Sequence, residues 1–400
     1  MGAVERDQHD RRRERHGPAF QSAFRSGRGS CHQTRRPALG LPTVSKSESP
    51  FLAKLKRANP SLVSSWAKRQ AKSVAARGGY LVTKMDDEAR RYARVSHNDA
   101  VPLPPGAEQT LRTDNPKLVA LQEAYDALDI SATAHSQWRQ SFLKRNLSLA
   151  WFRGDNAYVW QFRQLRNAAE ARMYLTLLDV ESRDRLGLLK RLEEDGKFGA
   201  WTFTYGNRPP VSRDLLDSVN EISYLDAQMG LSSIENLKVL DIGAGYGRMA
   251  HRVSAALPNL AAYDCIDGVA TSTFLCDYYL TYREAPDSVR VVPLPEYETL
   301  ADKYDLAVNI HSFSECSLEA IEWWLGQISQ RDIEWLLIVP NTPHQLLSTE
   351  IDGSMQDFSH LVRAAGYVQV DERPVFENDE LRALIDLHDT FHLFRREASQ

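Results

Sequence analysis

One stretch constrains the fold more than any other part of the chain: the sequence KVLDIGAGYGR at residues 238–248. A short apolar run leads directly into three glycines at alternate positions, Gly243, Gly245 and Gly247. Glycine tolerates positive φ and lets another molecule approach the backbone, so this pattern predicts a buried strand, a tight turn and the start of a helix. Turns of this kind present backbone N–H groups to nucleotide-type ligands.

The spacing of the glycines separates two kinds of nucleotide-binding turn. Dinucleotide-binding turns read G-x-G-x-x-G. In this chain Arg248 occupies the position of the third glycine of that pattern, and the third glycine present, Gly247, comes one residue earlier. One acid, Asp241, precedes the turn, and a second, Asp267, ends the next apolar segment. An acid about twenty residues after the turn fits the hydroxyls of a ribose. Asp267 therefore indicates a nucleoside ligand, and Gly247 disfavours a dinucleotide.

The pattern D-x-G-x-G-x-G resembles the first motif of the class I S-adenosylmethionine-dependent methyltransferases. Further stretches resemble one family, the sugar O-methyltransferases found among bacterial polysaccharide and glycan genes; these stretches are residues 152–163, 188–205, 211–225 and 304–316. The resemblance covers about residues 150–395. It implies an α/β fold with a Rossmann-like seven-stranded methyltransferase sheet. It also implies S-adenosyl-L-methionine as cofactor and transfer of a methyl group to a hydroxyl of a sugar or glycan.

The resemblance assigns the cofactor to the turn and to the ends of the neighbouring strands. The residues it implies are Asp241, Gly243, Gly245, Gly247, Asp267 and Asn309. Many class I methyltransferases carry an acid or amide for the adenine amine after the third strand, where this chain has Pro293-Leu294-Pro295-Glu296. We therefore expect Leu294 to contact the adenine through its backbone.

Apolar patterning after the turn predicts the remainder of the sheet. Strands are expected at 288–294, 305–310 and 334–341, and the segments 366–376 and 389–397 are expected to close the sheet as an antiparallel pair. Helices are expected at 271–283, 317–328 and 357–366. In open α/β sheets ligands lie beyond the carboxyl ends of the strands, so the residues that follow each strand are candidates for the site.

His311 and Glu315 follow the fourth strand, and His344 follows the fifth. A sugar hydroxyl is a poor nucleophile and needs a base, and a neutral imidazole titrates near working pH. We predict His311 as the general base, with Glu315 orienting the imidazole or accepting the proton itself, and His344 at the acceptor as the reserve base. Alternatively, His311 shapes the turn, and Ser312 and Glu315 form a capping box for the next helix.

Residues 152–163, FRGDNAYVWQFR, combine aromatic and polar side chains that suit a sugar. Aromatic faces stack on the ring, while Arg153, Asp155 and Asn156 take its hydroxyls. In the alternative interpretation the aromatic residues are core and Arg153 pairs with Asp155. Arg213 follows Ser212, a predicted helix cap, and is expected near the acceptor; ion pairing explains it equally well.

Composition places the chain among ordinary soluble proteins. Its hydrophobic content of 42%, charged content of 26% and formal charge of −4 favour neither nucleic acid nor membrane as a partner, and no apolar run is long enough for a membrane span. The four cysteines have neither zinc spacing nor the density of a disulfide scaffold, so we expect free thiols in the cytoplasm; they are Cys31, Cys265, Cys276 and Cys316. No metal ligands are predicted, because Glu350, Asp352 and Asp357 fall in a loop.

Three regions are expected along the chain. Residues 1–50, in which basic residues outnumber acids, form a disordered tail. Residues 51–210 form a helical region on the acceptor side, and residues 211–400 form the methyltransferase domain. An enzyme is the first hypothesis. A methyltransferase-like binding or scaffold protein without turnover, and a dehydrogenase that uses the same turn, are the alternatives.

Overall fold

The structure is a computed structural model that describes residues 101–397, apart from residues 140–141, 144–146, 155–157, 159–168 and 386. These residues belong to the second of the two units into which the chain divides, Thr83–Gln400. The predicted tail at residues 1–50 lies outside the described residues, and so do residues 51–100 of the predicted helical region. Asp155 and Asn156, two of the predicted acceptor-binding residues, also lie outside them.

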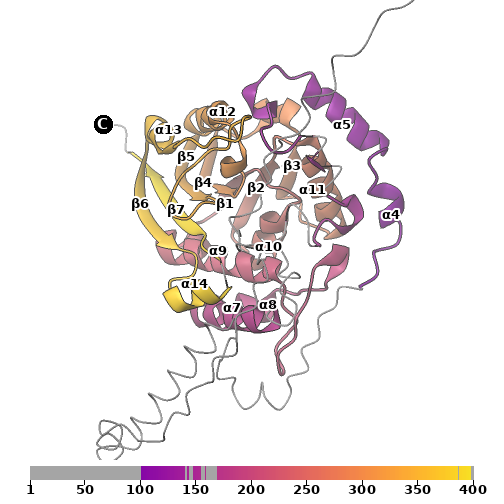
Figure 1. The fold of residues 1–400 in the computed structure, drawn as a ribbon, viewed down its shortest axis with the longest axis vertical. Helices are drawn as coiled ribbons and strands as arrows, with labels where there is room; N and C mark the ends of the chain where they lie inside the picture. Colours follow the sequence, from indigo (N-terminus) through magenta and orange to yellow (C-terminus); the bar gives the residue numbers. More distant parts are fainter. Residues whose placement is uncertain are drawn as a thin grey trace, which may run out of the picture. The chain divides into compact units, whose positions relative to one another are not determined.

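A seven-stranded sheet forms the centre of this unit, with β6 and β7 at one edge and β3 at the other (Figure 1). The strand order is β3-β2-β1-β4-β5-β7-β6, and β7 runs antiparallel to both of its neighbours. The strands are β1 (Leu237–Ile242), β2 (Leu260–Ile266), β3 (Val289–Val292), β4 (Lys303–Ile310), β5 (Asp332–Val339), β6 (Tyr367–Pro374) and β7 (Thr390–Arg396). The predicted Rossmann-like seven-stranded sheet and its antiparallel closing pair are confirmed.

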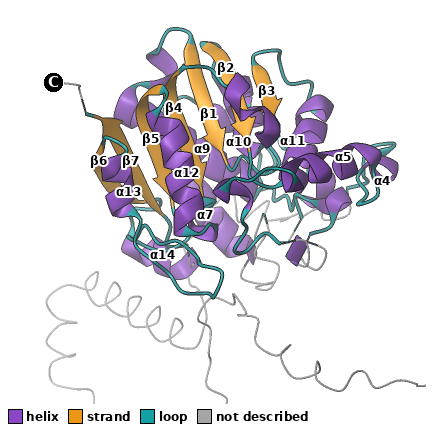
Figure 2. Ribbon diagram, turned by 90° about the horizontal axis from the view of Figure 1, so that it is seen from above, coloured by secondary structure: helices purple, strands orange, loops and turns teal. Residues whose placement is uncertain are grey.

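Helices cover both faces of the sheet (Figure 2). The strands are apolar on both faces and therefore need helices on both. In β5, Leu337 and Val339 belong to the core on one face, and Leu336 and Ile338 belong to the core on the other. Parallel strands buried on both faces read as continuous apolar runs, which is how the sequence of β5 reads. No helix among the described residues is long and apolar enough to cross a membrane.

The helices divide between the two cores. One core includes side chains of α7 (Ala169–Arg183), α8 (Leu188–Arg191), α9 (Arg213–Met229), α10 (Arg248–Ala256), α11 (Ala270–Tyr282) and α14 (Asp379–Ile385). The other includes side chains of α12 (Leu318–Ser329) and α13 (Ser359–Ala364). Earlier in the chain lie α4 (Ala107–Thr110) and α5 (Pro116–Asp126), and α5 packs against α11.

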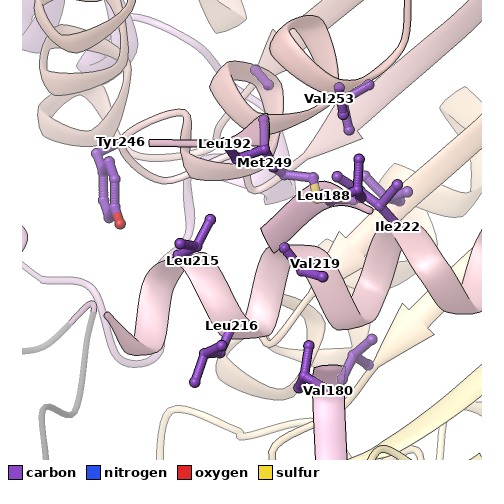
Figure 3. Close-up of a cluster of buried hydrophobic side chains, with 14 of the residues drawn as sticks. Val180, Leu188, Leu192, Leu215, Leu216, Val219, Ile222, Tyr246, Met249 and Val253 are labelled. Atoms are coloured by element: carbon purple, nitrogen blue, oxygen red, sulfur yellow. The ribbon is translucent and has the colours of Figure 1, made fainter. Parts of the chain in front are cut away.

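Helix α9 begins as its sequence predicts. The Ser212 hydroxyl oxygen accepts a hydrogen bond from the Leu215 backbone N–H at 3.1 Å, so Ser212 is the N-cap. Leu215, Leu216 and Val219 are fully buried, and Figure 3 shows these side chains on α9 within the hydrophobic cluster. The helix thus anchors the segment that leads into β1.

Helix α12 begins later than the capping-box alternative requires. The N-cap is Ser317, whose hydroxyl oxygen accepts from the Ala320 backbone N–H at 3.3 Å. Ser312 and Glu315 precede this point, at a short 3-10 turn, η7 (Phe313–Glu315). Cys316 adopts an extended conformation between the two helices. The capping-box interpretation is therefore wrong, and the Glu315 side chain is available for other contacts.

The segment that follows α5 lies against residues that follow β4. Ser131 begins a short 3-10 turn, η1 (Ser131–Thr133), and its hydroxyl donates to the Glu319 carbonyl at 3.2 Å. The Ser136 hydroxyl donates to the Glu315 carbonyl at 2.8 Å. Within the helical region predicted at residues 51–210, α5 therefore ends at Asp126, and the segment that follows it is irregular chain held against η7 and α12.

Candidate active site

The glycine turn joins β1 to α10 as the sequence predicts. All three glycines have positive φ, and Gly247 is the N-cap of α10. A Cβ on Gly243 would lie 2.3 Å from the Cβ and Oγ of Ser312, which directly follows His311 after β4. Only glycine therefore fits at this position, and the close approach brings the turn against the residues that follow β4.

Asp267 follows β2 and faces the turn. One carboxylate oxygen accepts from the Gly245 backbone N–H at 3.0 Å, and the other accepts from the Val269 backbone N–H at 2.8 Å. Burial raises the pKa of Asp267 to about 7, against the opposing effect of these two hydrogen bonds. A carboxylate oxygen has room for a second donor, so the side chain retains acceptor capacity for hydroxyl groups.

Asp241, inside β1, is almost completely buried. The Tyr263 hydroxyl on β2 donates to its carboxylate at 2.9 Å. Burial raises the pKa of Asp241 to about 7, although this hydrogen bond opposes the shift. A positive charge close to Asp241 would lower this pKa and favour the ionised carboxylate.

Asn309 connects β4 to the turn through both ends of its amide. Its Nδ2 donates to the Ile242 carbonyl at 2.8 Å, and its Oδ1 accepts from the Phe313 backbone N–H at 2.9 Å. The second hydrogen of Nδ2 has no partner in these two bonds. Asn309 therefore holds the carboxyl ends of β1 and β4 together, and its predicted cofactor contact stays a prediction.

The backbone N–H of Leu294, expected to contact an adenine, is occupied in this structure. It donates to the Tyr125 hydroxyl oxygen at 2.9 Å. The same hydroxyl lies 2.7 Å from the Thr273 hydroxyl and donates to the Asp267 carbonyl at 3.3 Å. Tyr125, which comes from α5, thus links the ends of β2 and β3.

His311 pairs with an acid that the sequence did not single out. Its Nε2 lies 3.4 Å from a carboxylate oxygen of Asp389, with the two side chains 37% and 24% exposed. Burial disfavours the imidazolium, but the hydrogen bond and charge of Asp389 outweigh it, so the pKa of His311 is raised. The pKa of Asp389 is lowered, because the partner imidazole outweighs the effect of burial.

The direction of β7 explains why these two residues meet. His311 directly follows β4, at the carboxyl end of a parallel strand. Because β7 runs antiparallel to β5, β7 begins beside the carboxyl ends of β4 and β5. Asp389 directly precedes the first residue of β7. An acid immediately before an antiparallel final strand is the signal that would have identified Asp389.

Glu315 makes its contacts elsewhere. Its carboxylate accepts from the Trp138 indole N–H at 2.6 Å and from the Asn341 amide at 3.1 Å. Burial raises the pKa of Glu315, opposed by these bonds and by the charge of His311. Asp389 rather than Glu315 therefore contacts the imidazole in this structure. The predicted catalytic roles of His311 and Glu315 stay predictions.

Arg213 and His344 flank the His311–Asp389 pair. The Nε of Arg213 donates to Asp217 at 3.1 Å, and its positive charge acts on both His311 and Asp389. His344 lies 3.4 Å from the Glu372 carboxylate, while its backbone N–H donates to the Thr390 hydroxyl at 3.3 Å. The structure thus gathers these two predicted residues near the start of β7.

Arg153 is completely buried, and it pairs with acids distant in sequence. Its guanidinium donates to Glu194 and to Asp214, each at 2.8 Å. The pKa of Arg153 is raised, because these carboxylates outweigh the effect of burial. Arg153 has no exposed surface and is held by these two carboxylates, and its predicted contact with an acceptor stays a prediction.

Two aromatic side chains stand beside the turn. The rings of Trp138 and Tyr158 are stacked, with centroids 5.2 Å apart. The Tyr158 hydroxyl lies 2.8 Å from the Ser272 hydroxyl, and its ring would lie 3.9 Å from a Cβ on Gly245. Since Trp138 also binds Glu315, this pair connects the glycine turn to the residues after β4. Nothing in its local sequence marked Trp138 for this place.

The part of the chain that the structure describes holds no group of three or more His, Cys, Asp and Glu side chains arranged for a metal ion. The loop acids have local partners instead. Glu350 accepts from the Leu318 backbone N–H at 2.9 Å, Asp352 accepts from the Ser354 hydroxyl at 2.7 Å, and Asp357 accepts from the Ser359 backbone N–H at 2.6 Å.

Comparisons with known proteins give similarity in structure only. No family model matches this chain, and no curated protein sequence matches it. Mitomycin 7-O-methyltransferase MmcR is similar over 46% of this chain, with 19% identity and a TM-score of 0.32. That alignment spans 57% of the MmcR chain.

Two further solved structures are similar over a larger share of this chain. Magnesium protoporphyrin IX methyltransferase from Synechocystis PCC 6803, with bound S-adenosylmethionine, matches 60% of this chain and 100% of its own, with 12% identity and a TM-score of 0.34. The [4+2]-cyclase SpnF matches 57% of this chain and 96% of its own, with 14% identity and a TM-score of 0.33. A shared fold does not by itself decide the reaction that a protein catalyses.

Proposed function

We propose that this protein is an S-adenosylmethionine-dependent O-methyltransferase that acts on a hydroxyl group of a sugar or glycan. The observation that carries the proposal is the meeting of the glycine turn, Asp267 and the His311–Asp389 pair at the carboxyl ends of neighbouring strands. Ligands of open α/β sheets bind at this edge. The sugar acceptor rests on the family resemblance of the sequence.

The residues at this edge fit the cofactor. The glycine turn has no side chains at three positions, and the backbone at Gly243 and Gly245 is only partly buried, so this part of the turn is where the amino-acid portion of S-adenosylmethionine would approach. The Asp267 carboxylate has acceptor capacity left for the two ribose hydroxyls. When bound, S-adenosylmethionine supplies a methyl group activated by the sulfonium. Asp241, Gly243, Gly245, Gly247, Asp267 and Asn309 are the residues that we propose hold it.

His311 supplies the base that an alcohol requires. The imidazole removes the hydroxyl proton of the acceptor as the oxygen attacks, and Asp389 stabilises the resulting imidazolium. Glu315, Arg213 and His344 provide further hydrogen-bonding groups around the same strand ends. The stacked pair of Trp138 and Tyr158 offers an aromatic surface of the kind on which sugar rings stack.

The experiment has two stages. Calorimetry with S-adenosylmethionine and S-adenosylhomocysteine measures cofactor binding, and release of S-adenosylhomocysteine is then measured with panels of monosaccharides, nucleotide sugars and simple phenols. Cofactor binding together with sugar-dependent release supports the proposal. Binding without turnover on any acceptor favours the non-catalytic alternative, turnover with phenols alone refutes the sugar acceptor, and absence of binding refutes the proposed function.

A further inference from the structure

A buried charged network lies directly beneath the glycine turn. We call it the turn-anchoring network; its members are Arg153, Glu194, Ser212, Asp214, Tyr246 and Arg252, and each is buried. It joins the turn itself, the first turn of α9, the loop before η4 (Lys197–Gly199) and helix α10. The turn and α10 are consecutive, but the other two segments are distant from them in sequence, so the network fixes how these parts meet.

Tyr246 attaches the turn to this network. It is the residue between Gly245 and Gly247, and its hydroxyl donates to the Asp214 carboxylate. Figure 3 shows the Tyr246 ring directed from the turn toward the first turn of α9, beside Leu215. The Asp214 oxygen that accepts this bond also accepts from the Arg153 Nε at 2.8 Å.

The network continues from Arg153 to the helix on the other side of the turn. Arg153 donates to Glu194 at 2.8 Å, and the same Glu194 oxygen accepts from the Ser212 hydroxyl at 2.6 Å and from Arg252 at 2.8 Å. Arg252 is on α10, which begins directly after Gly247. The network therefore binds the glycine turn at two points: at Tyr246 in the turn itself, and at Arg252 in α10, the helix that follows the turn.

Stability alone does not explain this arrangement. Four charged side chains of the network are at most 2% exposed, and removing charges from water often costs more than their attraction returns. One oxygen of Asp214 is buried without a hydrogen-bond partner, which adds a further cost. What the network does provide is a single geometry for the backbone between Gly245 and Gly247.

We infer that Asp214 is a positioning residue for the cofactor: by holding the Tyr246 hydroxyl and the Arg153 guanidinium on one oxygen, it fixes the glycine turn in the conformation that binds S-adenosylmethionine. The inference rests on the proposed function. It adds a residue that makes no contact with the cofactor but determines its affinity, and it gives Tyr246 a role that glycine spacing alone does not indicate.

Removal of one hydroxyl group tests this inference. Tyr246→Phe deletes the bond to Asp214 without leaving a charge unpaired, and Tyr367→Phe is the matched control. The Tyr367 hydroxyl is also buried and donates to the Ile333 carbonyl at 2.8 Å. Ile333 lies near the amino ends of the parallel strands, away from the glycine turn. We expect similar melting temperatures for the two variants, but affinity for S-adenosylmethionine weakened about fivefold or more in Tyr246→Phe only.

A second variant keeps the test decisive. Asp214→Asn preserves the shape of the side chain, and it should also weaken cofactor binding. In the double variant with Tyr246→Phe the losses should be less than additive, because both substitutions alter the contact between Tyr246 and Asp214. Unchanged affinity in Tyr246→Phe and Asp214→Asn, with binding by the wild type intact, overturns the inference but not the proposed function. A wild type that does not bind the cofactor overturns both.

Discussion

The imidazole of His311 lies 3.4 Å from the carboxylate of Asp389, although the two residues belong to different strand ends. His311 has a φ of 66°, in the left-handed region, so its backbone conformation sets the direction of the side chain. Asp389 also raises the pKa of His311, so this pair is the part of the proposed mechanism that substitutions can test most directly.

Replacement of His311 should abolish most turnover and leave the cofactor bound. We expect His311→Ala to lower the turnover number about a hundredfold or more, the usual effect of a lost general base, while cofactor affinity stays within a few fold. His311→Asn is the conformational control, because asparagine tolerates positive φ. Both variants should lose turnover in the S-adenosylhomocysteine release assay, and retention of activity by either removes His311 from this role.

Asp389→Asn should change the pH dependence of the reaction. An activity that needs neutral imidazole falls as the pH drops through the pKa of His311, and Asp389 raises that pKa. In the variant the acidic limb of the rate profile should therefore move to lower pH, with a rate at the plateau about tenfold lower or more. Asp332→Asn, an exposed acid paired with Lys303, is the control. An unshifted limb would contradict this role of Asp389.

Asp267→Ala should weaken the binding of S-adenosylmethionine about tenfold or more, because it leaves the ribose hydroxyls and the Gly245 backbone N–H without an acceptor. Asp305→Ala is the matched control. Asp305 also accepts from a backbone N–H, that of Lys238 at 2.7 Å, but it does so at the other end of β1. Calorimetry on both variants checks the prediction, and equal affinities would place the nucleoside elsewhere.

Asp241→Asn should change how stability depends on pH. The native pKa is raised from 3.8 to about 7, so the stability linked to this group is present below the unfolded value and is lost as the pH rises toward 7. The free energy of unfolding of the wild type should fall over this interval by up to about 4 kcal/mol more than that of the variant. Denaturant unfolding at pH 4.5 and 7.5 covers about 3 kcal/mol of this difference, and parallel changes in the two proteins would exclude it.

Gly243→Ala should destabilise the protein through a contact as well as through its backbone. The added Cβ would lie 2.3 Å from Ser312, whereas Gly187, with a φ of 66°, has open space around it. Gly187→Ala therefore measures backbone strain alone, about 1–2 kcal/mol, and Gly243→Ala should cost about 1–3 kcal/mol more. The second substitution Ser312→Gly should recover part of this difference. No recovery would mean that Ser312 is not the obstacle.

Local patterns were sufficient for most of the fold. The glycine turn, the cap at Ser212 and the apolar strands depend on neighbouring residues, and each was predicted and found. The helix expected at 317–328 is present as α12, with Ser317 as its N-cap. Only the alternative that Ser312 and Glu315 cap it was wrong, because the extended Cys316 separates them from the helix.

Contacts between distant segments were harder to predict. Asp155, the partner that the sequence offered for Arg153, lies outside the described residues. The guanidinium of Arg153 pairs with Glu194 and Asp214, which only the packing of α9 and its neighbouring loop brings near. Asp389 was missed for the same reason. The direction of β7 was predicted, but its place beside β5 is a property of the whole sheet and not of the residues around Asp389.

The position of β7 has a consequence for biosynthesis. The last strand in sequence is not at the margin of the sheet but between β5 and β6. While the polypeptide is being translated, β6 has no neighbour to pair with until residues 390–396 have emerged from the ribosome. The acid that contacts His311 directly precedes β7, so the imidazole cannot gain this partner until Asp389 has also emerged.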